Sequence, residues 1–162
     1  MKYLIFALLL VSQYAFALQI DDAFEVSDVT VGLANFDNET IYLKTDSVKY
    51  QENGTCTVAG KQKKCLMWAL SFKYTGSGND TELTCDFKTS QKVTRVDIYN
   101  TYPGKADSFK SIIRLPSGDG IKFLPGYANR DEKDAGILRT DIQCVHQGKL
   151  IFDKSFSIDL DR

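Results

Sequence analysis

Much of the chain alternates between apolar and polar residues with a period of two, which is the pattern of half-buried β-strands. The clearest run puts Trp68, Leu70, Phe72 and Tyr74 on one face. Three further runs have inward series Leu83–Cys85–Phe87, Phe109–Ser111–Ile113–Leu115 and Leu138–Thr140–Ile142–Cys144. No window of ten or more residues keeps an apolar stripe with helical spacing, so the regular part of the chain is predicted to be strand.

The last stretch of the chain also alternates, with one interruption. Its expected inward face is Leu150, Phe152, Phe156, Ile158 and Leu160, and Lys154 breaks that series. A break of this kind predicts a bulge or a twist near a sheet edge. Weaker strand signals cover 24–33, 40–50 and 93–99.

Turn residues separate these runs. Gly, Asn, Asp and Pro gather where the chain is expected to reverse, at 36–38, 52–54, 76–80, 102–104, 116–120, 125–126 and 147–148. The segment 145–150 reads as a tight hairpin, and a short helical turn is expected around 129–135. Many short strands with few helices indicate a sandwich or barrel. We predict an all-β fold, an antiparallel β-sandwich of about seven to nine strands.

The N-terminus reads as a secretory signal. Lys2 supplies a positive charge, 4–11 is an unbroken apolar run, and Ala15 and Ala17 are the small residues that signal peptidase needs. The apolar run is too short to span a membrane, and no second span follows. We therefore expect a signal peptide at 1–17 and one domain at 18–162, secreted or periplasmic.

The four cysteines lie in the exported part of the chain. An even number in such a protein predicts two disulfides, for which three connectivities exist. We favour Cys56–Cys65, which flanks a polar connector resembling a hairpin tip, and Cys85–Cys144, whose parities both point to the core. Metal binding by these cysteines is disfavoured, because no C-x-x-C occurs and His146 is the sole histidine.

A core disulfide with a tryptophan invites comparison with immunoglobulin domains. In those domains the tryptophan lies between the cysteines, whereas Trp68 precedes both Cys85 and Cys144. Ile142 occupies the place where a tyrosine would stand. We use "immunoglobulin-like" for the expected architecture only.

Charge and motifs exclude several function classes. The net charge is −1, and losing Lys2 with the signal brings it to −2, so no basic face suggests nucleic acid. Nucleophilic catalysis would depend on His146, because the cysteines are expected to be oxidised. Without a hydrolase, phosphate-loop or metal motif, we expect no enzyme and no cofactor.

Loop aromatics and a basic cluster are the candidate binding surface. Tyrosine in or beside a turn supplies contact area with a polar tip, and the residues are Tyr99, Tyr102 and Tyr127, with Lys61, Lys63 and Lys64. The competing interpretation is that the tyrosines plug the open ends of the core and the lysines form a solvated turn. Three sequons, at Asn38, Asn53 and Asn79, are glycan acceptors if the source is a eukaryote.

The leading functional hypothesis is an exported, non-enzymatic module that binds a protein or glycan through loops or a sheet edge. Three alternatives remain open: a secreted inhibitor or immunity protein, a structural subunit of a surface assembly, and a hydrolase using a carboxylate pair with raised pKa values.

Overall fold

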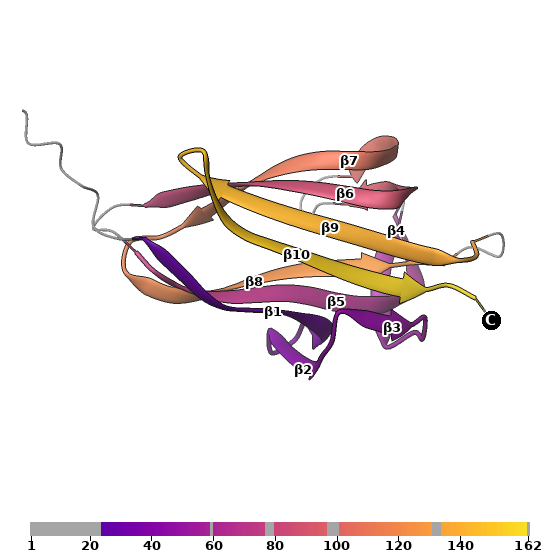
Figure 1. Cartoon of the computed structure of the whole chain (residues 1–162). Helices are drawn as coiled ribbons and strands as arrows, with labels where there is room; N and C mark the ends of the chain where they lie inside the picture. Colours follow the sequence, from indigo (N-terminus) through magenta and orange to yellow (C-terminus); the bar gives the residue numbers. More distant parts are fainter. Residues whose placement is uncertain (1–23, 59, 77–79, 97–100, 131–133, 162) are drawn as a thin grey trace, which may run out of the picture.

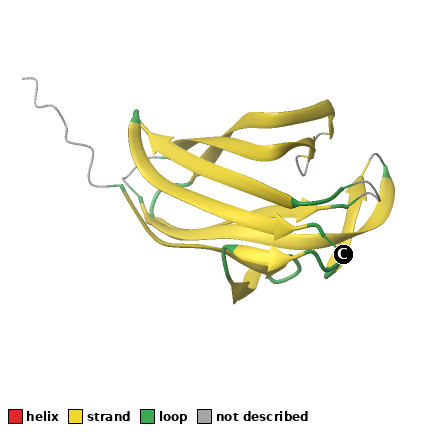
Figure 2. Cartoon of the chain, turned by 45° about the vertical axis from the view of Figure 1, so that its right-hand side comes forward, coloured by secondary structure: helices red, strands yellow, loops and turns green. Residues whose placement is uncertain are grey.

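The computed structural model describes residues 24–58, 60–76, 80–96, 101–130 and 134–161, with the backbone alone at strand positions 93–96 and 101–106. All regular structure in these residues is strand (Figure 2). The strands are β1 (Glu25–Asn35), β2 (Thr40–Lys44), β3 (Ser47–Lys49), β4 (Gly54–Val58), β5 (Lys61–Thr75), β6 (Thr81–Val96), β7 (Thr101–Leu115), β8 (Asp119–Ala128), β9 (Ile137–His146) and β10 (Lys149–Asp159).

Two predicted elements fall wholly or partly outside these residues. The expected signal peptide at 1–17 lies outside the described residues. Of the helical turn expected at 129–135, the described positions 129, 130, 134 and 135 are not helical. No helix in the described part of the chain has the length and apolar character to cross a membrane.

The described residues form ten strands in two sheets of five, where about seven to nine strands were predicted. The first sheet has the order β2-β1-β5-β4, with β8 also paired to β5; the second has the order β3-β10-β9-β6-β7. All pairs are antiparallel except β3 with β10. Figure 1 shows the two sheets as two layers.

The core lies between the layers and is built on the predicted inward series. Phe72 on β5 packs on Phe152 of β10 at 5.3 Å between ring centroids, and Trp68 stacks on Phe156 at 5.0 Å. These contacts join one sheet to the other. Leu70, Phe72, Tyr74, Leu83, Cys85, Ile113, Leu115, Ile142 and Cys144 are all buried, as their parity predicts.

The β9–β10 hairpin forms as predicted, but its inward series begins later than expected. Gln147 and Gly148 make the turn with φ of 49° and 78°. The bulge falls between Leu150 and Phe152, not at Lys154. Leu150 therefore pairs with outward-facing Val145 and is 52% exposed, so its predicted place in the core is wrong.

Two predicted turns lie inside strands. The 102–104 signal is part of β7, and the 125–126 signal is part of β8. Strand β8 tolerates Pro125 because it is an edge strand, paired only with β5 among the described residues. Its core side carries Gly120, Lys122, Leu124 and Gly126, so no apolar alternation was visible there.

Three other element boundaries are corrected. The lysine segment 61–64 is the start of β5 and not a turn, because the reversal is completed at Gly60 with φ of 76°. The 40–50 signal divides into β2 and β3. Residues 93–96 continue β6 and do not begin a new strand, and the rest of that expected strand, 97–99, is not described.

The favoured cysteine pairs are the disulfides of the structure, Cys56–Cys65 and Cys85–Cys144. The first joins the two strands of the β4–β5 hairpin. In the second, both cysteines are fully buried and lie directly opposite each other on β6 and β9, within one sheet. Two disulfides indicate an oxidising, extracytoplasmic environment.

We predict that the two disulfides differ in their contribution to stability. Their sequence separations are 59 and 9 residues. Loop-closure entropy in the unfolded chain makes the Cys85–Cys144 bridge worth roughly 4 kcal/mol and the Cys56–Cys65 bridge roughly 3 kcal/mol. Paired Cys→Ala variants compared by urea unfolding measure the difference. A larger loss for the Cys56/Cys65 pair would contradict the ranking.

We also predict that Gly126→Ala destabilises the fold. A Cβ at Gly126 would lie 2.4 Å from Cε2 of Trp68, which covers this glycine from the opposite strand. The indole has to move, at a cost of about 1–3 kcal/mol. Because Trp68 is the sole tryptophan, its fluorescence reports both the displacement and the unfolding midpoint. Pro125→Ala is the control on the same strand, and an unchanged midpoint for Gly126→Ala would refute the contact.

Candidate functional site

The predicted tyrosine and lysine positions divide into three groups. Tyr99 lies outside the described residues, and of Tyr102 only the backbone, within β7, is described. Tyr127 is half-buried on β8, and its Oη donates to the carbonyl of Thr57 at 3.4 Å. Burial raises the pKa of this phenol. The tyrosine therefore ties β8 to the β4–β5 hairpin.

The lysine segment lies at the same end of the molecule. Lys63 Nζ donates to Oδ1 of Asn129 at 3.4 Å, and Asn129 Nδ2 donates to the carbonyl of Lys64 at 3.1 Å. Lys61 and Lys64 are exposed on β5. The structure thus brings Tyr127 together with the lysine segment, and the contacts attach the hairpin to the chain that follows β8.

A second tyrosine, Tyr50, holds the C-terminal strand at this end. Arg130 lies over the Tyr50 ring at 5.4 Å, its backbone N–H donates to Tyr50 Oη at 3.3 Å, and its Nη1 donates to the carbonyl of Leu160 at 2.9 Å. Burial raises the pKa of Tyr50. These contacts favour the interpretation in which the tyrosines close the end of the core.

Asn53 has a structural role that its sequon did not reveal. Its Oδ1 accepts the N–H of Met67 and its Nδ2 donates to the carbonyl of Met67 at 3.0 Å, so the amide pairs with β5 as a main chain would. Nδ2 also donates to Tyr42 Oη at 2.7 Å. Asn38, by contrast, lies exposed in the β1–β2 turn, where its Oδ1 accepts from Thr40. Asn79 is outside the described residues.

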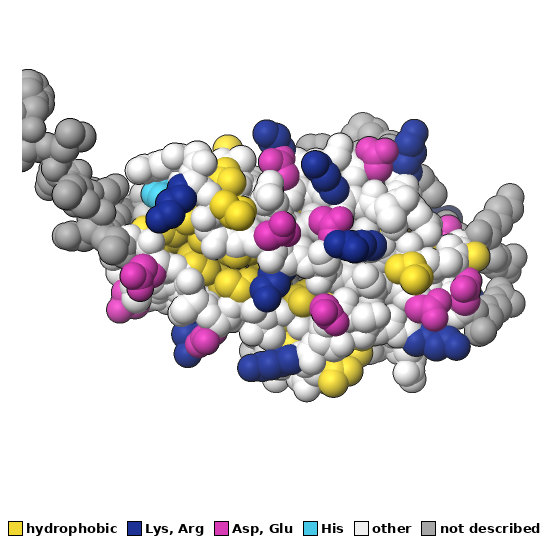
Figure 3. Space-filling model, viewed as in Figure 1, with side chains coloured by type: hydrophobic (Ala, Val, Ile, Leu, Met, Phe, Trp, Pro, Cys, Tyr) yellow, Lys and Arg dark blue, Asp and Glu magenta, His cyan; other side chains and the backbone are white. Residues whose placement is uncertain are grey.

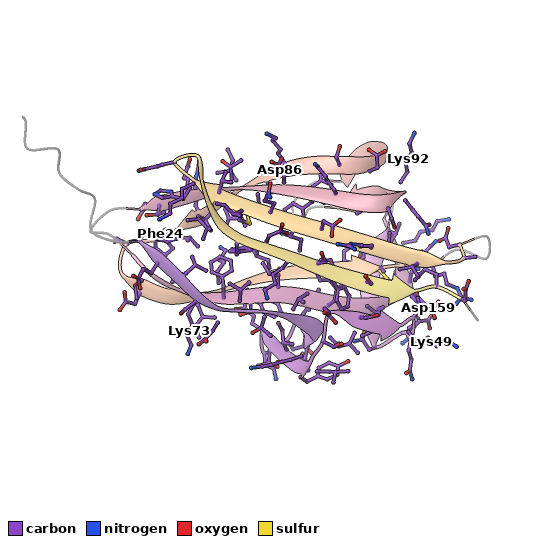
Figure 4. The ribbon with its side chains drawn as sticks, in the orientation of Figure 1. Phe24, Lys49, Lys73, Asp86, Lys92 and Asp159 are labelled. Carbon is purple, nitrogen blue, oxygen red and sulfur yellow. A yellow bond between two sulfur atoms is a disulfide. The ribbon has the colours of Figure 1, made fainter. Side chains whose placement is uncertain are left out.

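His146 and the acidic residues show structural contacts. His146 Nδ1 donates to the carbonyl of Glu82 at 3.0 Å, and its ring lies 5.2 Å from that of Phe24, which is labelled in Figure 4. Lys73 lowers the pKa of Asp28. A hydrogen bond from Ser155, with a second from Arg139, lowers that of Asp141. A general acid needs a raised pKa, and neither of these two shifts has that direction.

The outer face of the second sheet carries an apolar row that the sequence analysis missed. Register aligns Ile112, Thr84, Val145 and Leu150 across β7, β6, β9 and β10. Ile112 is 62% exposed and Leu150 52%. Figure 3 shows apolar side chains at the surface over the β9–β10 hairpin and between β10 and β1. The sequence analysis placed Ile112 and Leu150 in strands. Their alignment in one row depends on how β7, β6, β9 and β10 pair, which only the tertiary structure shows.

The sheet edges differ in how they are protected against pairing. Natural edges are kept short or are interrupted by proline, bulges or inward charges. Strands β2, β3 and β4 have five, three and five residues. The free stretches of β1 and β10 contain bulges. Strand β8 has Pro125 and the half-buried Lys122, which stands opposite core residue Phe72.

In strand β7 these devices are confined to residues 101–107, which contain Pro103 and two register shifts against β6. Residues 108–115 pair with 81–88 of β6 without a register shift and contain no proline. Its core-facing residues, Phe109, Ser111, Ile113 and Leu115, carry no charge. Among the described residues β7 pairs with β6 only. One side of this strand therefore presents a regular row of backbone donors and acceptors.

Comparisons with known proteins indicate neither a family nor a function for this chain. No family model matches the chain, and no curated protein matches it significantly. A solved structure of the alkylpurine DNA glycosylase AlkC from Pseudomonas fluorescens, bound to DNA containing an abasic site analog, is 14% identical with a TM-score of 0.37. The match covers 84% of this chain and 30% of the glycosylase, so this chain spans less than a third of that protein.

We predict that Asn53→Ala destabilises the protein by about 2 kcal/mol, because it removes three hydrogen bonds and leaves both main-chain groups of Met67 without this partner. Asn38→Ala, which loses one exposed contact, is the control and should cost under about 0.5 kcal/mol. Urea unfolding measures both. Equal losses would show that the Asn53 pairing contributes nothing particular.

Proposed function

We propose that this protein is an exported, non-enzymatic binding module that receives an extended segment of a partner protein on the free edge of β7. The observation that supports the proposal is the contrast between β7 and the other edges. Strand addition requires unpaired backbone groups in regular geometry, and every second residue of 108–115, four positions in all, turns its N–H and C=O away from β6. The scaffold in this proposal is a sandwich of immunoglobulin-like architecture, although its Cys85–Cys144 bridge lies within one sheet.

Packing supports the rigidity that such a site needs. Strand β7 rests on β6, and β6 is tied to β9 by the buried Cys85–Cys144 disulfide. Phe109 of β7 stacks on Phe87 of β6 with centroids 4.9 Å apart and ring planes at 7°. A rigid edge lowers the ordering cost of binding to the cost of the incoming segment alone.

Exposed Ile112 adds an apolar contact beside that edge. A strand paired to β7 would bring its outward side chains next to Ile112 and extend the row that runs to Leu150. Lateral pairing would cover part of an exposed apolar surface, and such surfaces mark interaction sites. The same features also suit self-association, which is the alternative of a surface-assembly subunit.

The test is a matched pair of serine-to-lysine variants on β7. Ser111→Lys places a charge on the core-facing side and gives β7 the protection that Lys122 gives β8, whereas Ser108→Lys places it on the outward side. The probe is a displayed library of random nine-residue segments selected on residues 18–162 with both disulfides intact. We expect selected segments to slow hydrogen exchange at 108–115 and to lose at least tenfold in affinity for Ser111→Lys only.

Three results decide the matter. Protection of β8 or of the β4–β5 hairpin instead of β7 would refute the proposal, as would unchanged affinity of a folded Ser111→Lys protein. Concentration-dependent dimers in sedimentation that Ser111→Lys abolishes would assign the edge to self-assembly and not to a partner. Unfolding curves show that each variant is folded before binding is compared.

A further inference from the structure

The outward side chains of β7 form a repeating pattern of charge and apolar surface. Lys110, Ile112 and Arg114 alternate with the core-facing residues and point away from the core. Their exposure is high: the side chains of Lys110 and Arg114 are 74% and 82% exposed, and Ile112 is 62% exposed. Two cations thus flank one apolar residue at intervals of two positions.

Both cations have their acidic partners on the β6 side. Lys110 Nζ lies 3.6 Å from Asp86 Oδ1, and Arg114 Nε donates to Glu82 Oε1 at 2.9 Å. Asp86 stands on the outer face of β6 in Figure 4. The acids are on β6, and the open edge is on the other side of β7. An incoming strand would therefore lie next to Lys110 and Arg114 and not next to the acids.

The core-facing side of the edge has the opposite character. Phe109, Ser111 and Ile113 offer uncharged surface, of which Ile113 is 5% exposed and Phe109 is half-buried. A charged residue of an incoming strand on that side would be desolvated without a partner, which is costly. Apolar or small uncharged residues fit there.

We propose that the partner segment recognised by β7 has the sequence pattern acidic–x–apolar–x–acidic. The acidic and apolar residues lie on its outward face, and the core-facing x positions are uncharged. This inference rests on the proposed function and names the chemistry of its partner. The acids would stand beside Lys110 and Arg114, and the central apolar residue beside Ile112. The pattern is the same in both chain directions, so it holds for parallel and antiparallel addition.

The expected selectivity follows from cross-strand pairing. Opposite charges on neighbouring strands stabilise a sheet and like charges destabilise it. Reversing two charges in the incoming strand should change affinity about tenfold. Because the pairs are exposed, the preference should decrease as salt rises from 50 to 500 mM, where the Debye length becomes shorter than the strand spacing.

The experiment uses two synthetic nine-residue peptides of alternating sequence. One has Glu, Val and Glu at its three central outward positions, the other has Lys, Val and Lys, and both have Val and Thr elsewhere. Titration calorimetry measures affinity, and hydrogen exchange at 108–115 shows whether the peptide pairs with β7. We expect the Glu peptide to bind about tenfold more tightly to the wild-type protein. The preference should reverse in a variant carrying Lys110→Glu and Arg114→Glu.

A second double variant supplies the charge-matched control. Lys149→Glu with Lys154→Glu makes the same change in net charge on β10, three strands from β7 in the same sheet, and should leave the preference unchanged. Equal affinity of both peptides, with β7 amides protected by each, would overturn the charge pattern and leave strand addition standing. Protection of β7 by neither peptide would count against strand addition itself, and the charge pattern would fall with it.

Discussion

The packing of β5 against β10 is the contact on which the rest of the structure depends. Strand β5 pairs with β1, β4 and β8, so every strand of the first sheet except β2 is hydrogen-bonded to it. Its aromatic residues Trp68 and Phe72 contact Phe156 and Phe152 of the second sheet. Burying one such ring stabilises the fold by roughly 2–3 kcal/mol relative to exposure. These contacts join the two sheets across one buried cluster of side chains.

The Cys85–Cys144 bridge acts in a different direction. It joins neighbours within the second sheet and therefore fixes the register of β6 on β9 and leaves the spacing between the sheets to the aromatic contacts. That register places Thr84 beside Val145 and so creates the apolar row. The row and the free edge of β7 are both consequences of how this sheet is assembled.

The candidate site residues fall into two groups, the polar side chains at one end of the molecule and the edge strand β7. Tyr50, Tyr127 and Asn53 all have hydrogen-bond partners that hold strands together, which accounts for polar side chains at this end of the two sheets. Strand β7 has the opposite character: its residues 108–115 are regular and, among the described residues, are paired on one side only. Side-chain hydrogen bonds hold this end of the fold together without using the edge of β7. The backbone groups of that edge can therefore remain available for another molecule.

The alternating residues by themselves determined the strand class and the inward faces of β5, β6, β7 and β9, because a period of two is a local property of the chain, and the turn residues at 147–148 determined the β9–β10 turn. Cysteine parity and spacing likewise favoured both disulfides. The sequence did not reveal β8, since Lys122 and two glycines occupy its core side, or the outward turn of Leu150, since a bulge changes parity without a local signal. It also did not show that Asn53 pairs with Met67. Which edge stays free, and which residues form one row, depends on the strand order and register. Only the tertiary structure decided these, because they are set by contacts between segments far apart in the chain.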